Sequence, residues 1–359
     1  AYCAGRGAGD QVLEVAESVG EMPDTCSYHR MHMGMAAAVQ KGIPIKEEVV
    51  LPLPDLMIDG RLCVEMSHYA EGLYRRLGTR VVAVDVPPME HDADGPRLAA
   101  FVERQVRETL IPTLEEVCGR PFDYGNLSHV LSVLKQTATI RNRCWEYFKL
   151  IPSPWTLWDY GVSIAPVFYL MGKPETVPYY QKLEAELSER AARKVSAILP
   201  QERYRLYWDG WLPWAFLGLF SRKMTAQGAV PICGRYPWEF FPHPEAIEPE
   251  PDPVHSYINL WFDPEIGPAH NPVRAVRFIG KAIEDYSLDG MVFFASKTCR
   301  MWSMDAADII DELERRHGIP GVIIEADMAD SQMVSEAQID TRLAALFEMI
   351  DGRRKVRRG

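Results

Sequence analysis

The segment "DTCSYHRMHMGMAAAV", which begins at Asp24, contains one cysteine, two histidines and three methionines between its third and twelfth residues. Thiolate, imidazole and thioether groups are the softer metal ligands of proteins, so the segment is a candidate metal site. A zinc site would need a second pair of ligands, and only His29 and His32 stand three residues apart here. The methionines alternate with other residues and would point to different faces of a helix, so they are better interpreted as core or pocket residues than as a copper site.

Three cysteines stand where a strand is expected to lead into a helix: Cys26, Cys63 and Cys299. In open parallel sheets, ligands bind beyond the carboxyl ends of the strands, so these thiols would converge on one point. A helix N-terminus lowers the pKa of a thiol, and thiolates bind iron–sulfur clusters. The alternative is that each cysteine is a small buried apolar residue, and we expect that role for the cysteines in helix-like or strand-like patterns, Cys118, Cys144 and Cys233.

The elements that position these cysteines alternate between β-branched runs and long helical patterns, which is typical of parallel sheets with crossover helices. Strands are expected at 47–54, 79–87, 203–210, 289–296 and 320–327. Helices are expected at 31–40, 66–77, 96–118, 126–150, 177–199, 211–227, 272–286, 305–317 and 338–351. A proline- and aromatic-rich stretch, 234–272, has neither period and is interpreted as an ordered binding loop.

The chain of 359 residues is long enough for two cores, and the segment around 149–170, with three prolines and two tryptophans, interrupts the pattern. We therefore expect an N-terminal α/β domain over 1–155 that supplies two cysteines, and a C-terminal α/β domain over 156–359 that supplies the third.

Charge and composition exclude several classes of protein. The net charge of -11 argues against a nucleic-acid partner, and the one basic run, at the C-terminus, is expected to be frayed. No apolar run is long enough to cross a membrane, and no basic segment followed by an apolar one indicates a secretory signal. Seven scattered cysteines do not predict a disulfide framework, so we expect a cytoplasmic protein. No GxxxxGK[ST] motif is present, so any ATP would be bound by another chain.

Together these motifs resemble the 2-hydroxyacyl-CoA dehydratase D-component family, which includes the catalytic subunits of ATP-dependent benzoyl-CoA reductase. The family's Cys-Ser-x-x-Arg motif is matched by Cys26, Ser27 and Arg30, its second cysteine by Cys63, and its third by the end of "DGMVFFASKTC", Cys299. The family's C-terminal motif is matched by Glu325, Asp327, Gln338, Thr341 and Arg342. One departure is "LCVEMSH", where the family has Asp after the second cysteine, so that Glu65 or His68 takes a related place.

The resemblance implies two flavodoxin-like domains with parallel sheets, and a 4Fe-4S cluster held by Cys26, Cys63 and Cys299. Some relatives instead hold a double-cubane iron–sulfur cluster. It also implies a homologous second subunit, a separate ATP-hydrolysing iron–sulfur activator and an acyl-CoA substrate. The reaction would be one-electron reduction of an aromatic acyl-CoA such as benzoyl-CoA; the alternatives are dehydration of a 2-hydroxyacyl-CoA, or an electron-relay role beside a catalytic partner.

Further site residues are expected around this centre. His29, His32, His68 and Glu65 are candidate proton donors or hydrogen-bond donors near the cysteines, with a structural histidine as the alternative. An aromatic substrate site is expected from residues of "LYWDGW" and of the 234–272 loop, with a core role as the alternative: Trp208, Asp209, Trp211 and Trp238, together with Gln338 and Arg342.

Overall fold

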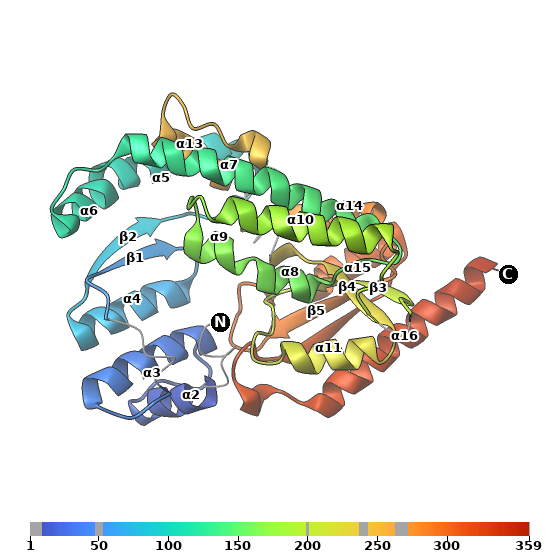
Figure 1. Cartoon of the computed structure of the whole chain (residues 1–359). Coiled ribbons are helices and arrows are strands. Elements are labelled where there is room, and N and C mark those ends of the chain that lie inside the picture. Colours follow the sequence, from blue (N-terminus) through green and yellow to red (C-terminus); the bar gives the residue numbers. More distant parts are fainter. Residues whose placement is uncertain (1–8, 47–52, 199–200, 237–242, 263–271, 359) are drawn as a thin grey trace.

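Four parallel strands form the larger sheet of the computed structural model, which describes residues 9–46, 53–198, 201–236, 243–262 and 272–358 (Figure 1). The strands are β3 (Tyr204–Asp209), β4 (Ala229–Cys233), β5 (Gly290–Ser296) and β6 (Gly321–Ala326), in the order β4-β3-β5-β6. Every residue of β3 and β4 is buried, as expected for parallel strands covered on both faces. One face carries α11 (Leu217–Thr225) and α16 (Glu336–Arg358), and the other carries α14 (Pro272–Asp285) and α15 (Ala306–His317) (Figure 1).

A smaller sheet pairs β1 (Leu56–Arg61) with β2 (Arg80–Asp85) in parallel, and α4 (Val64–Leu77) connects the two strands. Helix α4 packs against α3 (Ser27–Lys41), which in turn packs on α2 (Gly9–Ser18). Gly42 ends α3 in the left-handed conformation at φ 65°, which glycine adopts without steric cost. The βαβ unit thus places the beginning of α4 at the carboxyl end of β1.

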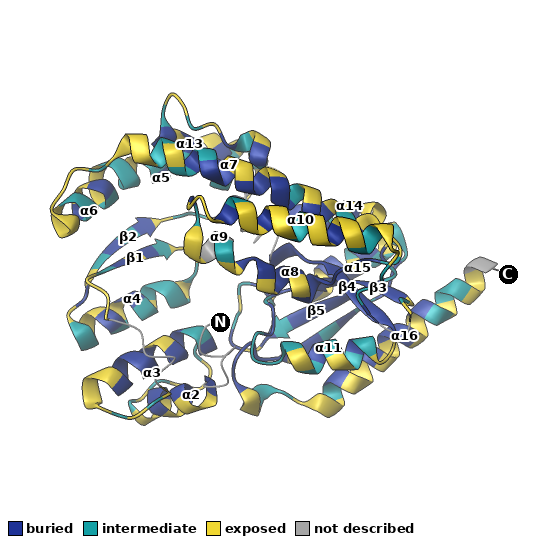
Figure 2. Ribbon diagram, viewed as in Figure 1, coloured by how far each residue is buried: buried dark blue, intermediate teal, exposed yellow. Residues whose placement is uncertain are grey.

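A layer of helices extends across both sheets (Figure 1). It comprises α5 (Gly95–Gln105), α6 (Ile111–Cys118), α7 (Tyr124–Glu146), α8 (Leu157–Ser163), α9 (Ala165–Leu170), α10 (Thr176–Ala192) and α13 (Pro253–Phe262), with a π-helix at Val106–Leu110. Single-turn 3-10 helices lie at Asp92–Asp94, Tyr147–Lys149, Pro244–Ala246 and Ser331–Met333. Buried residues concentrate on the larger sheet and on the helix faces turned toward it, while the outer helix faces are exposed (Figure 2).

The α/β class with parallel sheets and crossover helices is confirmed. The order of the larger sheet, numbered within itself, is 2-1-3-4, which is how the flavodoxin-like order begins. The smaller sheet has two strands among the described residues, so the pair of flavodoxin-like domains stays a prediction. The division at residue 155 also stays a prediction; across it, Val254, Ile258 and Phe262 of α13 pack with Leu98 and Val102 of α5.

Two strands were not expected from the sequence. One of them is β1, which begins at Leu56, just after the strand predicted over 47–54. Residues 47–52 of that predicted strand lie outside the described residues. Strand β4, "AVPIC", contains Pro231, which cannot donate a ladder hydrogen bond and so argues against a strand. The proline is tolerated because β4 is the edge strand of its sheet.

The helix content of three segments differs from the prediction. The predicted helix over 211–227 is α11, which begins only at Leu217. The stretch predicted to lack periodic structure contains α13. The basic C-terminal run is the end of α16, and not a frayed tail, because Arg353 donates to the Gly318 carbonyl at 2.6 Å and Arg354 pairs with Asp289 at 2.7 Å.

Within the described residues, no helix is both long and apolar enough to cross a membrane.

Candidate active site

The structure brings the three predicted cysteines to one place. Cys26 immediately precedes α3, Cys63 immediately precedes α4, and Cys299 follows β5 in the turn that leads toward α15. The thiol of Cys299 interacts electrostatically with that of Cys26 and also with that of Cys63. All three are partly buried and free of disulfides. The three thiols therefore lie in one region, where Cys63 follows β1 and Cys299 follows β5. The strand expected before Cys26 was wrong, because α2 and a turn precede Cys26.

Burial dominates the acid–base behaviour of these thiols. It raises the pKa of Cys26 to about 12, although backbone N–H groups of His29 and Tyr28 favour the thiolate. Burial likewise raises the pKa of Cys299, against an opposing hydrogen bond from Trp211. The expectation that the helix N-terminus lowers these pKa values was wrong for Cys26, because desolvation of the thiolate outweighs the helix amides. Cys26 and Cys299 therefore stay protonated until a metal centre takes the place of the proton.

The donor set fits an iron–sulfur cluster better than a single ion. Among the residues that the structure describes, no three His, Cys, Asp or Glu side chains are close enough together to hold one metal ion. A cluster is a larger body than one ion, so its thiolate ligands stand further apart. The three thiols supply sulfur, the ligand type that holds such clusters, and each is partly buried.

An aromatic wall, formed by Tyr28, Trp211, Tyr236 and Trp302, adjoins the thiols. Trp211 lies at its centre, with ring centroids 5.3 Å from Tyr28, 4.6 Å from Tyr236 and 6.2 Å from Trp302. Its indole Nε1–H donates to the Sγ of Cys299 at 3.3 Å. The predicted site residue Trp211 thus contacts a cysteine directly, and the wall gives the site an apolar side.

Tyr28 was missed by sequence reasoning. Its hydroxyl is buried without a hydrogen-bond partner, and its ring interacts electrostatically with Cys26 and Cys299. A buried phenol O–H without a partner is costly unless a bound group accepts from it. Its place two residues after Cys26 was the available signal, but the sequence could not show that its hydroxyl lacks a partner.

Two other predicted substrate residues lie inside the protein. Trp208 is 1% exposed and packs between Phe294 and Phe220, with centroids at 5.5 and 5.1 Å. Asp209, also 1% exposed, accepts two hydrogen bonds from Arg235 at 2.7 and 3.1 Å. Both side chains therefore serve the core and a buried ion pair, and neither offers a free surface to a substrate.

The predicted histidines separate into two groups. His29 is buried 3.6 Å from Glu21 and 3.8 Å from Glu65, with its ring 5.2 Å from that of the exposed His68. Burial lowers the pKa of His29, and the nearby carboxylates oppose that effect. His29, Glu65 and His68 thus gather at the Cys63 side of the site. His32 is exposed and packs on Tyr69 at 5.1 Å, a ring that His29 also contacts at 5.5 Å.

The remaining predicted site residues lie elsewhere. Gln338 and Arg342 are on the first turns of α16, half-buried and exposed respectively. Trp238 lies outside the described residues.

The chain is thus an α/β protein in which three free thiols gather in one region. The profile of the family described as 2-hydroxyglutaryl-CoA dehydratase, D-component, matches residues 1–350, so the chain belongs to this family. This confirms the resemblance carried by the motifs.

Several curated relatives are similar along nearly the whole chain. The alpha subunit of lactoyl-CoA dehydratase from Anaerotignum propionicum is 28% identical, over 97% of this chain and 83% of the relative. A subunit of benzoyl-CoA reductase from Thauera aromatica is 26% identical, over 97% and 81%. The (R)-phenyllactyl-CoA dehydratase alpha subunit of Clostridium sporogenes is 24% identical, over 98% and 83%. The relatives are thus subunits of dehydratases and of a reductase.

Proposed function

We propose that this chain is the iron–sulfur subunit of an enzyme that performs one-electron chemistry on an aromatic acyl-CoA thioester, with reduction of a benzoyl-CoA-like ring as its reaction. The observation that carries the proposal is the grouping of Cys26, Cys63 and Cys299 beside the aromatic wall. When bound, a thiolate-held 4Fe-4S cluster supplies single electrons at low potential. A double-cubane cluster would use the same thiols.

The chain's own residues have separate tasks in this proposal. The three thiols bind the cluster, and Trp211 donates a hydrogen bond to one ligand sulfur. The aromatic wall excludes water, and its two partly exposed members, Tyr28 and Trp211, would offer ring surface to an aromatic acyl group. The free hydroxyl of Tyr28 is placed to donate a hydrogen bond to a bound polar group such as the thioester carbonyl. His29, His68 and Glu65 are the nearest groups able to exchange a proton with solvent.

The second candidate is dehydration of a 2-hydroxyacyl-CoA, because two of the three relatives above are named as dehydratase subunits. The two reactions differ in stoichiometry. Ring reduction consumes two electrons and two protons per product, whereas dehydration releases water and returns its electron, so that reductant is needed only to start turnover.

Partners follow from the same reasoning. The relatives are each named as one subunit of a larger enzyme, which supports a second, homologous subunit for this chain. The electron would come from a separate ATP-hydrolysing iron–sulfur activator. An electron-relay role would differ by having substrate bind beside the partner's cluster instead of this one. The proposed location is the cytoplasm, where thiols stay reduced.

The experiment is anaerobic purification followed by iron, sulfide and EPR measurement, then turnover with the activator, ATP and a strong reductant. We expect about four irons per chain for a single cubane. Consumption of benzoyl-CoA with two electron equivalents per product supports ring reduction. Consumption of a 2-hydroxyacyl-CoA with catalytic amounts of reductant would establish dehydration instead.

A further inference from the structure

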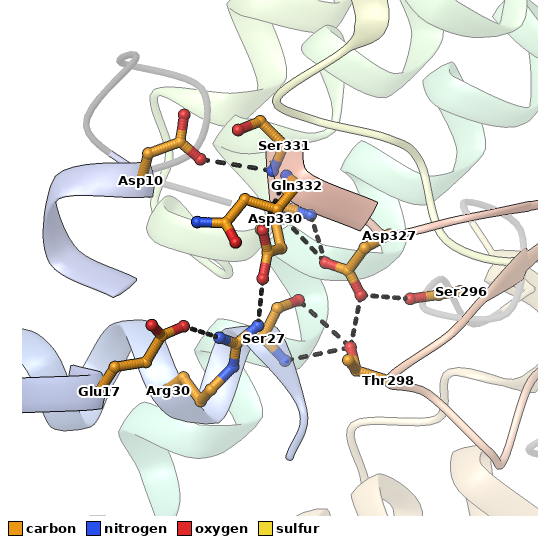
Figure 3. Close-up of polar contacts among 11 residues, drawn as sticks. Asp10, Glu17, Ser27, Arg30, Ser296, Thr298, Asp327, Asp330, Ser331 and Gln332 are labelled. Atoms are coloured by element: carbon orange, nitrogen blue, oxygen red, sulfur yellow. Dashed lines mark hydrogen bonds and ion pairs between the residues drawn. The ribbon is translucent and has the colours of Figure 1, made fainter. Parts of the chain in front are cut away.

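The neighbours of two cysteines join segments that are far apart in the sequence. Ser27 follows Cys26 and begins α3, and Thr298 precedes Cys299 after β5. The backbone N–H of Ser27 donates to the Oγ1 of Thr298 at 3.2 Å, across 271 residues of sequence (Figure 3). A change in this contact therefore moves one thiol relative to the other.

A single carboxylate, Asp327, organises this junction. Strands β5 and β6 are paired so that Ser296 lies opposite Ala326, and Asp327 is the next residue. Asp327 is 0% exposed and accepts from the hydroxyls of Thr298 at 2.5 Å and Ser296 at 3.2 Å. Its second oxygen accepts from the backbone N–H groups of Ala329 and Asp330, both at 2.9 Å (Figure 3). Four donors thus converge on one side chain.

The hydroxyl of Thr298 transmits this arrangement to α3. A hydroxyl has one proton to donate and two lone pairs that accept. Because Thr298 directs its proton to Asp327, a lone pair is left facing the N–H of Ser27. Asp327 thereby fixes the direction in which Thr298 accepts.

A second contact ties the same carboxylate to α3. The fully buried Arg30 donates to the Oδ2 of Asp330 at 2.6 Å and to Glu17 at 2.9 Å. The backbone of Asp330 is held in place by Asp327. Asp327 therefore reaches the beginning of α3 twice, through Thr298 to Ser27 and through Asp330 to Arg30 (Figure 3).

We propose that Asp327 is a positioning residue that sets the spacing of Cys26 and Cys299 through Thr298 and Asp330. The inference concerns the thiols of this chain, and its relevance to a cluster rests on the proposed function. Among the described residues Asp327 makes no hydrogen bond to either thiol, although its charge contributes to the raised pKa of Cys299, so its effect on thiol spacing passes through its neighbours.

Asparagine cannot replace Asp327, although it has the same shape. With its NH₂ group toward Thr298, two donors meet, and Thr298 must turn its proton toward the Oγ of Ser27, an acceptor 3.5 Å away. With its NH₂ group toward the backbone, that group faces the N–H groups of Ala329 and Asp330. Either orientation loses hydrogen bonds that the carboxylate accepts, so Asp327→Asn weakens the junction without changing its volume.

The test measures thiol spacing in the full chain without any cluster. Dibromobimane fluoresces only after both of its arms have reacted, so the rate of fluorescence gain reports the approach of two thiols. Cys26→Ser gives the background from other cysteines. The variants are Asp327→Asn, Thr298→Val and Thr298→Ser, with circular dichroism and the Tm recorded for each. Glu202→Gln is the matched control, because Glu202 is a 4%-exposed carboxylate that accepts from Arg205 away from the thiols.

We expect Asp327→Asn and Thr298→Val to slow cross-linking about tenfold, the scale set by loss of a hydrogen bond to a charged group. Thr298→Ser keeps the hydroxyl and should react at the wild-type rate, as should Glu202→Gln even though its Tm falls. Wild-type rates in folded Asp327→Asn and Thr298→Val would overturn the proposal, and so would equal slowing in Glu202→Gln. If Asp327→Asn does not fold, the comparison of Thr298→Val with Thr298→Ser decides. Because no iron is needed, a wild-type protein without a cluster would refute the proposed function and leave this result standing.

Discussion

The indole N–H of Trp211 lies 3.3 Å from the sulfur of Cys299, and it donates a hydrogen bond to that thiol. The contact links the aromatic wall to a proposed cluster ligand. Hydrogen bonds to ligand sulfurs stabilise the more negative, reduced form of an iron–sulfur cluster and so raise its reduction potential. Trp211 would therefore control the electron-transfer potential of the site.

Replacing Trp211 by phenylalanine should lower the midpoint potential of the cluster. The substitution keeps an aromatic ring but removes the N–H that stabilises the ligand sulfur. We expect a shift on the order of 50 mV. In a one-electron couple this shift is a part of the free energy of one charge-assisted hydrogen bond. Anaerobic redox titration followed by EPR measures this shift.

Trp158→Phe is the matched control for that substitution. Trp158 is buried, whereas Trp211 is partly exposed, and the Nε1 of Trp158 has no hydrogen-bond partner, so its replacement costs packing without removing a bond to sulfur. Its potential should equal that of the wild type. An unchanged potential in Trp211→Phe, or an equal shift in both variants, would refute the role of the indole.

Trp208 should affect stability and not substrate affinity. Its ring is enclosed by Phe220, Phe294 and Trp158, so Trp208→Ala would leave a cavity and reduce the free energy of unfolding by about 3–5 kcal/mol. Trp208→Phe should lower the Tm by less and leave the KM for the acyl-CoA unchanged. Chemical denaturation and steady-state kinetics measure the two quantities. A large rise in KM with an unchanged Tm would contradict this prediction and indicate that Trp208 contacts the substrate.

Acid should weaken the attachment of α13 to the helical layer. Arg107, in the π-helix, hydrogen-bonds Asp252 at 2.6 Å and thereby lowers the pKa of that carboxyl group. Burial raises the pKa of Glu103, but hydrogen bonds from His255 and Arg107 lower it by more than burial raises it, so its net shift is also downward. A lowered carboxyl pKa gives stability above the unfolded-state pKa, and that stability is lost as pH falls through the folded-state value.

Arg107→Gln tests this pH dependence. Because Asp252 is about half exposed at 47%, solvent screening limits the expected loss at neutral pH to about 1 kcal/mol. The difference between variant and wild type should shrink as the pH falls from about 4 through the lowered pKa of Asp252, because the carboxyl groups then become protonated in both proteins. Urea unfolding over a pH series measures it. A difference that stays constant down to low pH would show that Arg107 acts through packing alone.

Val64 is expected to lie in the interface with the proposed second subunit. It follows Cys63 and is 82% exposed, beside Leu62 at 43%. Glutamate is compatible with the first turn of a helix, so Val64→Glu should leave the fold intact while placing a charge in the interface. Co-purification with the partner subunit should weaken at least about tenfold.

Val356→Glu provides the comparison for Val64→Glu. Val356 is 81% exposed near the end of α16, so it matches Val64 in exposure but not in location. Its substitution should leave co-purification unchanged. Equal effects of both substitutions, or of neither, would place the interface elsewhere.

The sequence predicted the parts of the site that depend on order along the chain. Parallel strands end at one edge of a sheet, so Cys299 after β5 and Cys63 before α4 could be placed from turns and periodicity alone. The grouping of Cys26 with Cys299 was expected from strand-to-helix junctions and from the family motif; Cys299 acts electrostatically on Cys26, and their role as cluster ligands stays a prediction. Strand β4 was missed because Pro231 normally interrupts a strand.

The parts that failed depend on three-dimensional burial. Trp208 and Trp211 lie in one aromatic run, yet Trp208 faces the core while Trp211 reaches Cys299, because the strand ends between them. The raised pKa of Cys26 reflects desolvation that no local pattern reveals. The role proposed for Asp327 could not be predicted, because it depends on four donors, two at or just after the end of β5 and two after β6, that point at one carboxylate.

The central claim is that three thiols of this chain hold one iron–sulfur cluster. Its most direct test is iron and sulfide content, measured anaerobically on the wild type and on Cys26→Ser, Cys63→Ser and Cys299→Ser, with Cys118→Ser, an exposed cysteine away from the site, as control. We expect about four irons per chain in the wild type and the control, and loss of most of that iron in each of the other three. Full iron occupancy in all three variants, or a wild type without iron, would contradict the account.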